Sequence, residues 1–207
     1  MAQDSQGNDI NAVPVPKGGA ISFAPYAPEN ILKPEDIGIK VAAVKLPDAY
    51  FKGGLMKQDG GPADESGKGD STEFFQEGYS LSKSPDLTTA VSLAEDNANT
   101  RLLCYGTEPD ENGVYHVDTL TPDRKWCAYY EEPRKNGTVY RRAGIVQVTE
   151  NKPDQAERGT VKGKAVTFTW QRDPAYGGDA WIDCVYGEKT DAPSQPSTPT
   201  NTGAGSD

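Results

Sequence analysis

Long hydrophobic runs are missing from this 207-residue chain. A helix that crosses a membrane needs about 20 consecutive apolar residues, and no stretch approaches that length. The first residues, Met1 to Asp4, lack the basic and apolar regions of a signal peptide. We therefore expect synthesis in a cytoplasm and no membrane insertion. The length favours one domain with terminal arms.

Histidine and catalytic motifs are scarce as well. His116 is the only histidine, which excludes a mechanism with two, and we expect it at the surface or at a strand edge. No nucleophile elbow, zinc-protease, phosphate-loop or dinucleotide motif is present. The three cysteines, Cys104, Cys127 and Cys184, lack the C-x-x-C spacing of zinc sites, so reduced core thiols are the favoured interpretation. The sequence predicts no enzyme and no cofactor.

Basic residues are outnumbered, since 31 Asp and Glu stand against 21 Lys and Arg, a formal net charge of −10. A nucleic-acid reader needs a basic patch that displaces counterions from phosphates, so this class is disfavoured. Asp59, Asp64, Glu65 and Asp70 have enough oxygens for calcium, but their spacing is not that of an EF-hand. A solvated loop is the better interpretation of this cluster.

Tryptophan and carboxylate side chains leave a sugar site open. Trp181 lies close to Asp183 in the sequence, and aromatic platforms on β-sandwiches bind glycans, while paired carboxylates could form a glycosidase site. Any acidic sandwich with three tryptophans offers such a pairing. We therefore favour Trp126, Trp170 and Trp181 as core or interface aromatics.

What the chain does contain is short alternation of apolar and polar residues. Val166, Phe168 and Trp170 alternate with polar neighbours, which is the pattern of a strand with one buried face. Asn136-Gly137 tolerates positive φ and predicts a hairpin between its flanking strands. The fold class is therefore predicted as mainly β, an antiparallel sandwich or barrel. Strands are expected at 39–44, 74–81, 87–93, 114–120, 126–130, 138–148, 166–170 and 180–186.

One helix is expected within this β pattern. Ser92-Leu93-Ala94-Glu95 matches a capping box, Ala98 and Leu102 continue a helical spacing from Ala94, and Gly106 can end the helix. The sequence thus predicts a single helix at about 93–105, with its apolar stripe against the sheet.

Three segments are expected not to fold alone. Residues 1–30 are proline-rich and predicted as an extended N-terminal arm without a helix or central strand. Residues 188–207 are rich in Ser, Pro and Thr and predicted as a flexible C-terminal tail. Within the domain at 31–187, a loop at 52–71 contains six glycines, and such loops are functional or disordered. Its apolar pair, Leu55 and Met56, contacts either a neighbouring subunit or its own domain.

The order of these features resembles a known family. The proline arm, the 39–44 strand, the glycine-rich loop, the strand pair at 74–93, the helix opened by Ala94-Glu95-Asp96-Asn97, and the closing Val166-Thr167-Phe168-Thr169-Trp170 with Tyr186-Gly187 are similar to the major tail tube protein of long-tailed, non-contractile (siphovirus-type) bacteriophages. The resemblance covers roughly residues 20–187 and is one of element order, without a short diagnostic motif.

The resemblance implies a β-sandwich with one short helix that forms hexameric rings, stacked into the hollow tail tube of a virion and assembled in the host cytoplasm. The implied partners are copies of itself and the tape-measure, terminator and distal tail proteins. Genomic DNA would pass through without specific binding, and an acidic lumen would repel its phosphates within a Debye length of about 8 Å. The lumen-facing residues stay unassigned.

In that family the long loop and the arms bridge subunits and rings. The subunit- and ring-interface candidates of this chain are Leu55, Met56, Lys57, Asp59, Asp64, Glu65, Lys68, Asp70, Phe23 and Tyr26. Deleting 188–207 is expected to leave polymerisation intact. Two other classes stay open: another phage structural protein, such as a tail terminator, connector or capsid decoration protein, and a monomeric glycan-binding sandwich that uses Trp181 or Trp170.

Overall fold

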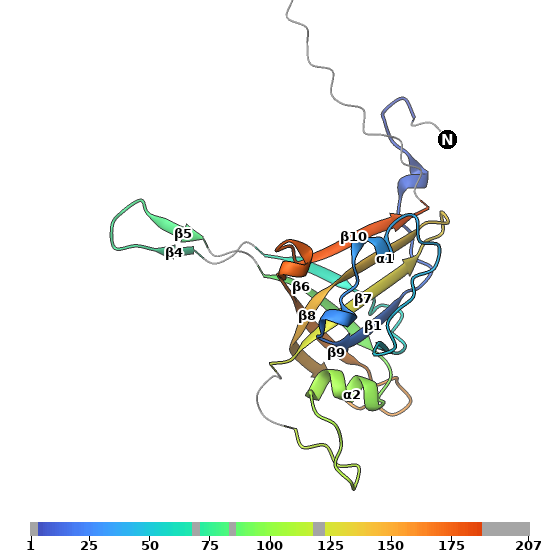
Figure 1. Ribbon diagram of the computed structural model, residues 1–207, viewed down its shortest axis with the longest axis vertical. Helices are drawn as coiled ribbons and strands as arrows, with labels where there is room; N and C mark the ends of the chain where they lie inside the picture. Colours follow the sequence, from blue (N-terminus) through green and yellow to red (C-terminus); the bar gives the residue numbers. More distant parts are fainter. Residues whose placement is uncertain (1–3, 68–70, 83–85, 118–122, 188–207) are drawn as a thin grey trace, which may run out of the picture.

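The fold is known from a computed structural model, which describes residues 4–67, 71–82, 86–117 and 123–187. In this part of the chain strands dominate and helices are short (Figure 1). The strands are β1 (Ala20–Pro25), β2 (Phe51–Lys52), β3 (Ala63–Ser66), β4 (Ser71–Glu73), β5 (Ser80–Ser82), β6 (Leu87–Leu93), β7 (Lys125–Pro133), β8 (Val139–Pro153), β9 (Lys164–Gln171) and β10 (Trp181–Tyr186). The helices are α1 (Pro34–Ile37) and α2 (Ala98–Tyr105), with 3₁₀ turns at Ile10–Ala12, Pro28–Asn30 and Pro174–Tyr176.

The predicted mainly β, antiparallel class is confirmed. One sheet has the order β2-β1-β7-β8-β9-β6-β3, and β4 and β5 form a separate pair. The long strand β8 pairs with β7 along one edge. Its other edge pairs with β10 as far as Gly144 and with β9 from Ile145 onward, so the sheet forks at this point.

Gly144 is required at the fork because the space beside it is already filled. A Cβ atom there would lie 2.6 Å from Cζ3 of Trp170 and 2.9 Å from the carbonyl oxygen of Ala180. These distances are shorter than van der Waals contact. Only glycine therefore lets the Trp170 indole of β9 lie across β8 at the point where the pairing of β8 with β10 ends.

The sheet curls until its two ends meet. Phe23 of β1 and Phe168 of β9 belong to strands that are not neighbours in the sheet, yet their ring centroids are 5.8 Å apart. Beyond β2 the chain crosses to β6, where Met56 bridges Leu93 and the Ala94 amide donates to the Leu55 carbonyl oxygen. The segment after β2 therefore closes the curled sheet into a barrel.

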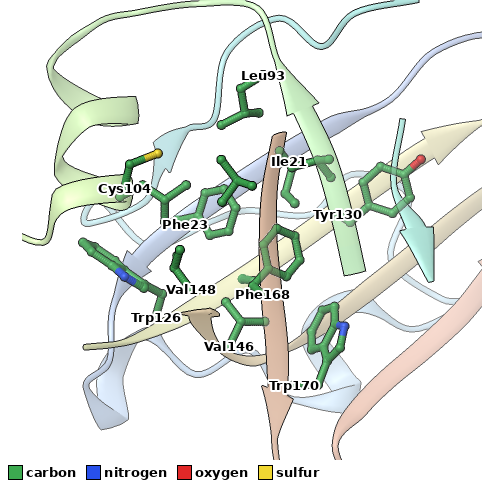
Figure 2. Close-up of a cluster of buried hydrophobic side chains, with 14 residues drawn as sticks. Ile21, Phe23, Leu93, Cys104, Trp126, Tyr130, Val146, Val148, Phe168 and Trp170 are labelled. Carbon is green, nitrogen blue, oxygen red and sulfur yellow. The ribbon is translucent and has the colours of Figure 1, made fainter. Parts of the chain in front are cut away.

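The barrel encloses one main core, to which β1, β6, β7, β8, β9 and α2 contribute (Figure 2). The alternation predicted for 166–170 is confirmed: Val166, Phe168 and Trp170 are buried, while Thr167 and Thr169 lie on the outer face. A smaller cluster of Leu32, Ile37, Tyr129 and Ala143 lies on the opposite face of the sheet and holds α1.

The hairpin and helix predictions have different outcomes. Gly137 adopts φ 88° in the turn between β7 and β8, as predicted. The helix, however, begins at Ala98 and not at 93, because β6 continues through Leu93. Asn97 is the true cap, with its side chain accepting from the Thr100 amide, and Gly106 ends the helix in the left-handed region as expected. The short helix α1 was not predicted.

Several strand and arm predictions are wrong. Residues 39–44 form a turn and a bend and no strand, residues 114–117 form no strand, and 118–122 lie outside the described residues. The predicted N-terminal arm contains β1, a central strand between β2 and β7, because its prolines flank the strand and Pro25 stands at its end. The predicted loop at 52–71 contains β3. Of the predicted 74–81 strand, residues 74–79 form the turn between β4 and β5, and only 80–81 belong to a strand, β5.

Candidate assembly surfaces

A two-stranded ribbon stands away from the barrel (Figure 1). Ser66 faces Leu87 in the β3–β6 pair, and Ser71 faces Ser82 in the β4–β5 pair. From the first of these pairs to the second, one strand advances by as many residues as the other recedes, so both pairs share a single antiparallel register. We call residues 63–67, 71–82 and 86–90 the ribbon.

The tip of the ribbon exposes apolar side chains that nothing in the described chain covers. Phe75 is 104 % exposed, and Phe74, Tyr79 and Leu81 are also exposed large hydrophobic residues. The Phe74 amide donates to the Tyr79 carbonyl oxygen at 3.1 Å, which closes the turn. Large apolar side chains gathered on a projecting hairpin mark an interaction site or an aggregation hazard. The sequence prediction missed them as a surface because aromatic alternation also fits a half-buried strand.

A second surface is the outer edge of β10. This strand pairs only with β8 among the described residues, so its other edge offers backbone donors and acceptors. Such an edge is a template for another strand.

The N-terminal segment is a third surface: Pro16 bridges Arg134 beside the β7–β8 turn, and Ile10, Val13 and Val15 are exposed.

A groove of about 730 Å³ lies between the N-terminal segment and the segment after β2. Gly18 and Gly19 line one wall, Leu55 and Pro62 the other, with Tyr130 also in the lining. Leu55 is 70 % exposed there. The groove therefore leaves Leu55, a predicted interface residue, accessible to another chain.

The predicted interface candidates scatter over different environments. Phe23 is fully buried in the core of its own domain, so its side chain has no surface for a neighbour, and that assignment is corrected. Met56 packs partly buried against the same core, which fits the own-domain alternative. Lys57 forms an ion pair with Asp154 at 3.0 Å, and this partner raises the pKa of the Lys57 ammonium.

The remaining candidates lie nearer the surface. Tyr26 is partly exposed and donates its hydroxyl proton to Asp173 at 2.8 Å, a bond that raises the pKa of the phenol. Asp59 and Glu65 are exposed, and Asp64 pairs with Arg142 at 2.8 Å. Lys68 and Asp70 lie outside the described residues. Of the predicted set, Asp64 and Glu65 belong to the ribbon.

The described residues bring no catalytic constellation together. No group of three His, Cys, Asp or Glu side chains in them could hold a metal ion. His116 is exposed, with Nε2 3.4 Å from the Asp110 carboxylate. Burial raises the pKa of both Cys104 and Cys127 to about 11, so these thiols are poor nucleophiles at neutral pH. Among the described residues, no helix is long and apolar enough to cross a membrane.

Comparisons with known proteins add a distant structural likeness. No protein-family model and no curated protein matches the sequence. A chain of the PVC sheath–tube complex, an extracellular contractile injection system in its extended state, matches with 9 % identity and a TM-score of 0.38, over 89 % of this chain and 99 % of that one. A chain of the anti-feeding prophage (AFP) baseplate, 6-fold symmetrised, matches with 9 % identity and a TM-score of 0.37, over 86 % and 97 %. At these scores the likeness does not decide how this chain assembles.

Proposed function

We propose that this chain is a structural subunit that polymerises with copies of itself into stacked, hexameric rings, which form the hollow tube of a phage-tail-type particle. The ribbon is the observation that carries the proposal. Its tip places Phe74, Phe75, Tyr79 and Leu81 outside any core of the described chain. A second copy that covers them would remove this apolar surface from water.

Ring formation is supported by the unpaired edge of β10. When one edge of a subunit binds a different edge of the next, the contact is heterologous, and a rotation that closes generates a ring. The available edges include β10 and the outer side of β3, which pairs only with β6 among the described residues. Strand addition at these edges would continue the sheet from one subunit to the next.

Stacking is supported by the projection of the ribbon and by the exposed N-terminal segment. Both leave the barrel, so each can reach a copy in the same ring or in the next (Figure 1). Leu55, in the groove beside the N-terminal segment, is one apolar contact such a copy can meet. The tape-measure, terminator and distal tail proteins are further proposed partners, and DNA would pass without specific binding.

The lumen would be lined by a polar sheet face. Thr167, Thr169 and Gln171 lie on the outer face of β9, and Thr167 lies near Glu150 of β8. A face without large apolar groups and with carboxylates nearby would not retain DNA phosphates. A non-contractile tail and a tube within a contractile sheath both fit this proposal.

A monomeric glycan-binding function has less support. Trp126 and Trp170 are buried, and the ring of Trp181 is covered by the Arg142 guanidinium at 4.4 Å. The two buried rings offer no face to a sugar, and Arg142 already occupies one face of the partly buried Trp181 ring. A terminator, connector or capsid decoration protein stays an alternative, because each would also use exposed edges.

Electron microscopy of the purified protein over a concentration series, with its mass from light scattering, tests the proposal. We expect rings or tubes from the unaltered protein, fewer from Phe75→Ser, and no change from Val161→Ser, which alters an exposed apolar residue away from the ribbon. A single ring that never stacks would favour the terminator or connector. A folded monomer at all concentrations, unaffected by added tail initiator, would contradict self-assembly.

A further inference from the structure

A buried arginine connects the root of the ribbon to the barrel. Arg142 on β8 is 8 % exposed and lies on the core side of the sheet, next to the fork. Its Nη1 atom donates to Oδ1 of Asp64 at 2.8 Å, and Nη2 lies 2.8 Å from Oδ2. Two parallel bonds to one carboxylate fix direction as well as distance.

Asp64 stands on β3, and this strand has little else to hold it. Its four residues, Ala63–Ser66, are all exposed and include no large apolar side chain. The pairing with β6 covers these four residues only. Thr89 of β6 donates to the Asp64 carboxylate at 2.6 Å and accepts from the Trp170 indole at 2.8 Å. Within the described residues, the Asp64 carboxylate thus joins β3 to the core through its bonds to Thr89 and Arg142.

On its other side Arg142 reaches the free-edge strand. Nε donates to the Tyr140 hydroxyl at 2.8 Å, and that hydroxyl donates to Asp183 of β10 at 3.0 Å. The guanidinium also lies 4.4 Å from the ring centre of Trp181, at the start of β10. One cation therefore contacts the groups that position the ribbon and those that position the unpaired edge.

We propose that Asp64 and Arg142 are a positioning pair that fixes the direction in which the ribbon leaves the barrel, relative to the β10 edge. A two-stranded ribbon has no core of its own and is marginally stable in isolation. Its direction is therefore set where it is rooted, and losing one bidentate contact releases the outgoing strand while the barrel stays folded. The link to assembly rests on the proposed function, whereas the link to ribbon direction does not.

The charge state of Asp64 is consistent with this role. Burial alone raises the pKa of its carboxyl, but the bonds from Arg142 and Thr89 outweigh burial, and the pKa is lowered overall. The carboxylate is therefore ionised at neutral pH and able to accept both guanidinium bonds.

Two variants test the pair on the full chain. Asp64→Asn keeps the size of the side chain but loses the charge and one acceptor oxygen. Asp86→Asn is the matched control, because Asp86 is an exposed carboxylate at the returning side of the same root, with no ion pair in the described part of the chain. A Cys184→Ser background carries spin labels at Gln76 and Glu157, since Cys104 and Cys127 are buried.

In the monomer, we expect Asp64→Asn to broaden the label-to-label distance distribution and Asp86→Asn to leave it unchanged. Amide exchange in β3 should accelerate by at least about tenfold, the loss of roughly 1.4 kcal/mol, while exchange in β7 stays the same. Equal distributions and equal β3 exchange in the two variants would overturn the positioning role.

Assembly gives a separate result. If the unaltered protein forms tubes, Asp64→Asn should raise the concentration needed for them and Asp86→Asn should not. Tubes of unchanged yield from a variant with a broadened ribbon would overturn the assembly part of the inference. Failure of the unaltered protein to assemble would contradict the proposed function and leave the monomer result to decide the pair.

Discussion

The barrel and the ribbon are built from the same kind of strand but differ in where their apolar side chains go. Strand β6 belongs to both: its end near Leu93 is buried under α2 and the β2–β3 segment, while its beginning near Leu87 is the root of the ribbon. In the barrel, Phe168 has no exposed surface, whereas Phe75 at the ribbon tip is fully exposed. A phenylalanine side chain therefore contributes to folding in the barrel, whereas at the ribbon tip it is free to contribute to association.

Stability and assembly can therefore be altered separately in this chain. A change inside the barrel alters the free energy of unfolding of the monomer, because it removes buried area or introduces a clash. A change at the tip of the ribbon leaves that free energy almost unaffected, because the exposed tip side chains belong to no core of the described residues.

The largest expected effect comes from a matched pair of phenylalanine truncations. Phe168→Ala should lower the free energy of unfolding by about 3–5 kcal/mol, because the ring is fully buried against Phe23 and Trp170. Phe75→Ala should change it by less than about 0.5 kcal/mol. Urea unfolding followed by tryptophan fluorescence measures both. Comparable losses from the two variants would break the distinction between barrel and ribbon.

A clash at the fork is expected to have the next largest effect. Gly144→Ala introduces a Cβ 2.6 Å from the Trp170 ring and 2.9 Å from a backbone oxygen, which should cost about 1–3 kcal/mol. Gly61→Ala is the control, because a Cβ there meets nothing within 4 Å. Thermal unfolding of the two variants should separate them, and a stable Gly144→Ala protein would mean that the fork can open.

The helix cap should have a smaller effect. Asn97→Ala removes the side-chain acceptor of the Thr100 amide at 3.0 Å, and losing such a cap costs about 1 kcal/mol. Ser92→Ala, at the position that the sequence predicted as the cap, should cost less, because Ser92 lies within β6. Circular dichroism melts compare the two. A greater loss of stability from Ser92→Ala than from Asn97→Ala would support the helix start near residue 93 that the sequence predicted.

The smallest effect is expected from an ion pair at the barrel end. Arg101 and Lys164 both bond to Asp96, which holds its pKa below the usual range of about 3.9. A depressed carboxyl pKa contributes stability that is present above the unfolded value and is lost as the pH falls below about 4. The carboxylate is half exposed, so each pair is worth less than about 1 kcal/mol.

Asp96→Asn should therefore flatten the acid limb of the stability curve below about pH 4. Glu73→Gln, on a ribbon strand with no ion pair in the described residues, is the control. Urea midpoints collected from pH 7 to pH 2 provide the comparison. An unchanged acid limb in Asp96→Asn would show that the pair does not contribute to folding.

Alternation allowed β6, β7, β9 and β10 and the start of β8 to be predicted with boundaries close to those observed, whereas β1, β2 and β3 were missed. Runs such as 87–93 and 166–170 have one apolar face, and the turn at Asn136-Gly137 needs positive φ whatever surrounds it. Predictions failed where the local pattern competes with the tertiary context. Residues 39–44 are as apolar as a strand, but they bend so that the carbonyl oxygens of Val41 and Ala42 accept from the buried Arg141 guanidinium.

The assembly surfaces were only partly predictable. The segment at 52–71 was identified as unusual from its glycines, and Asp64 and Glu65 do lie on the ribbon. Phe23 was misplaced because a proline-rich neighbourhood hides the fact that β1 is paired on both sides. The exposed aromatic tip could not be predicted, since Phe74-Phe75 reads as core until the register of the ribbon is known.

Sequence alone was enough for the fold class, for the barrel strands from β6 to β10, for the position of the main hairpin turn and for the lack of familiar catalytic motifs. These depend on local period, turn chemistry and composition, which act over a few residues. Only the tertiary structure decided that β8 forks between β9 and β10, that Arg142 meets Asp64, and which aromatic residues stay outside the core. These features depend on contacts between residues far apart in the chain, and a local pattern carries no information about which distant face covers it.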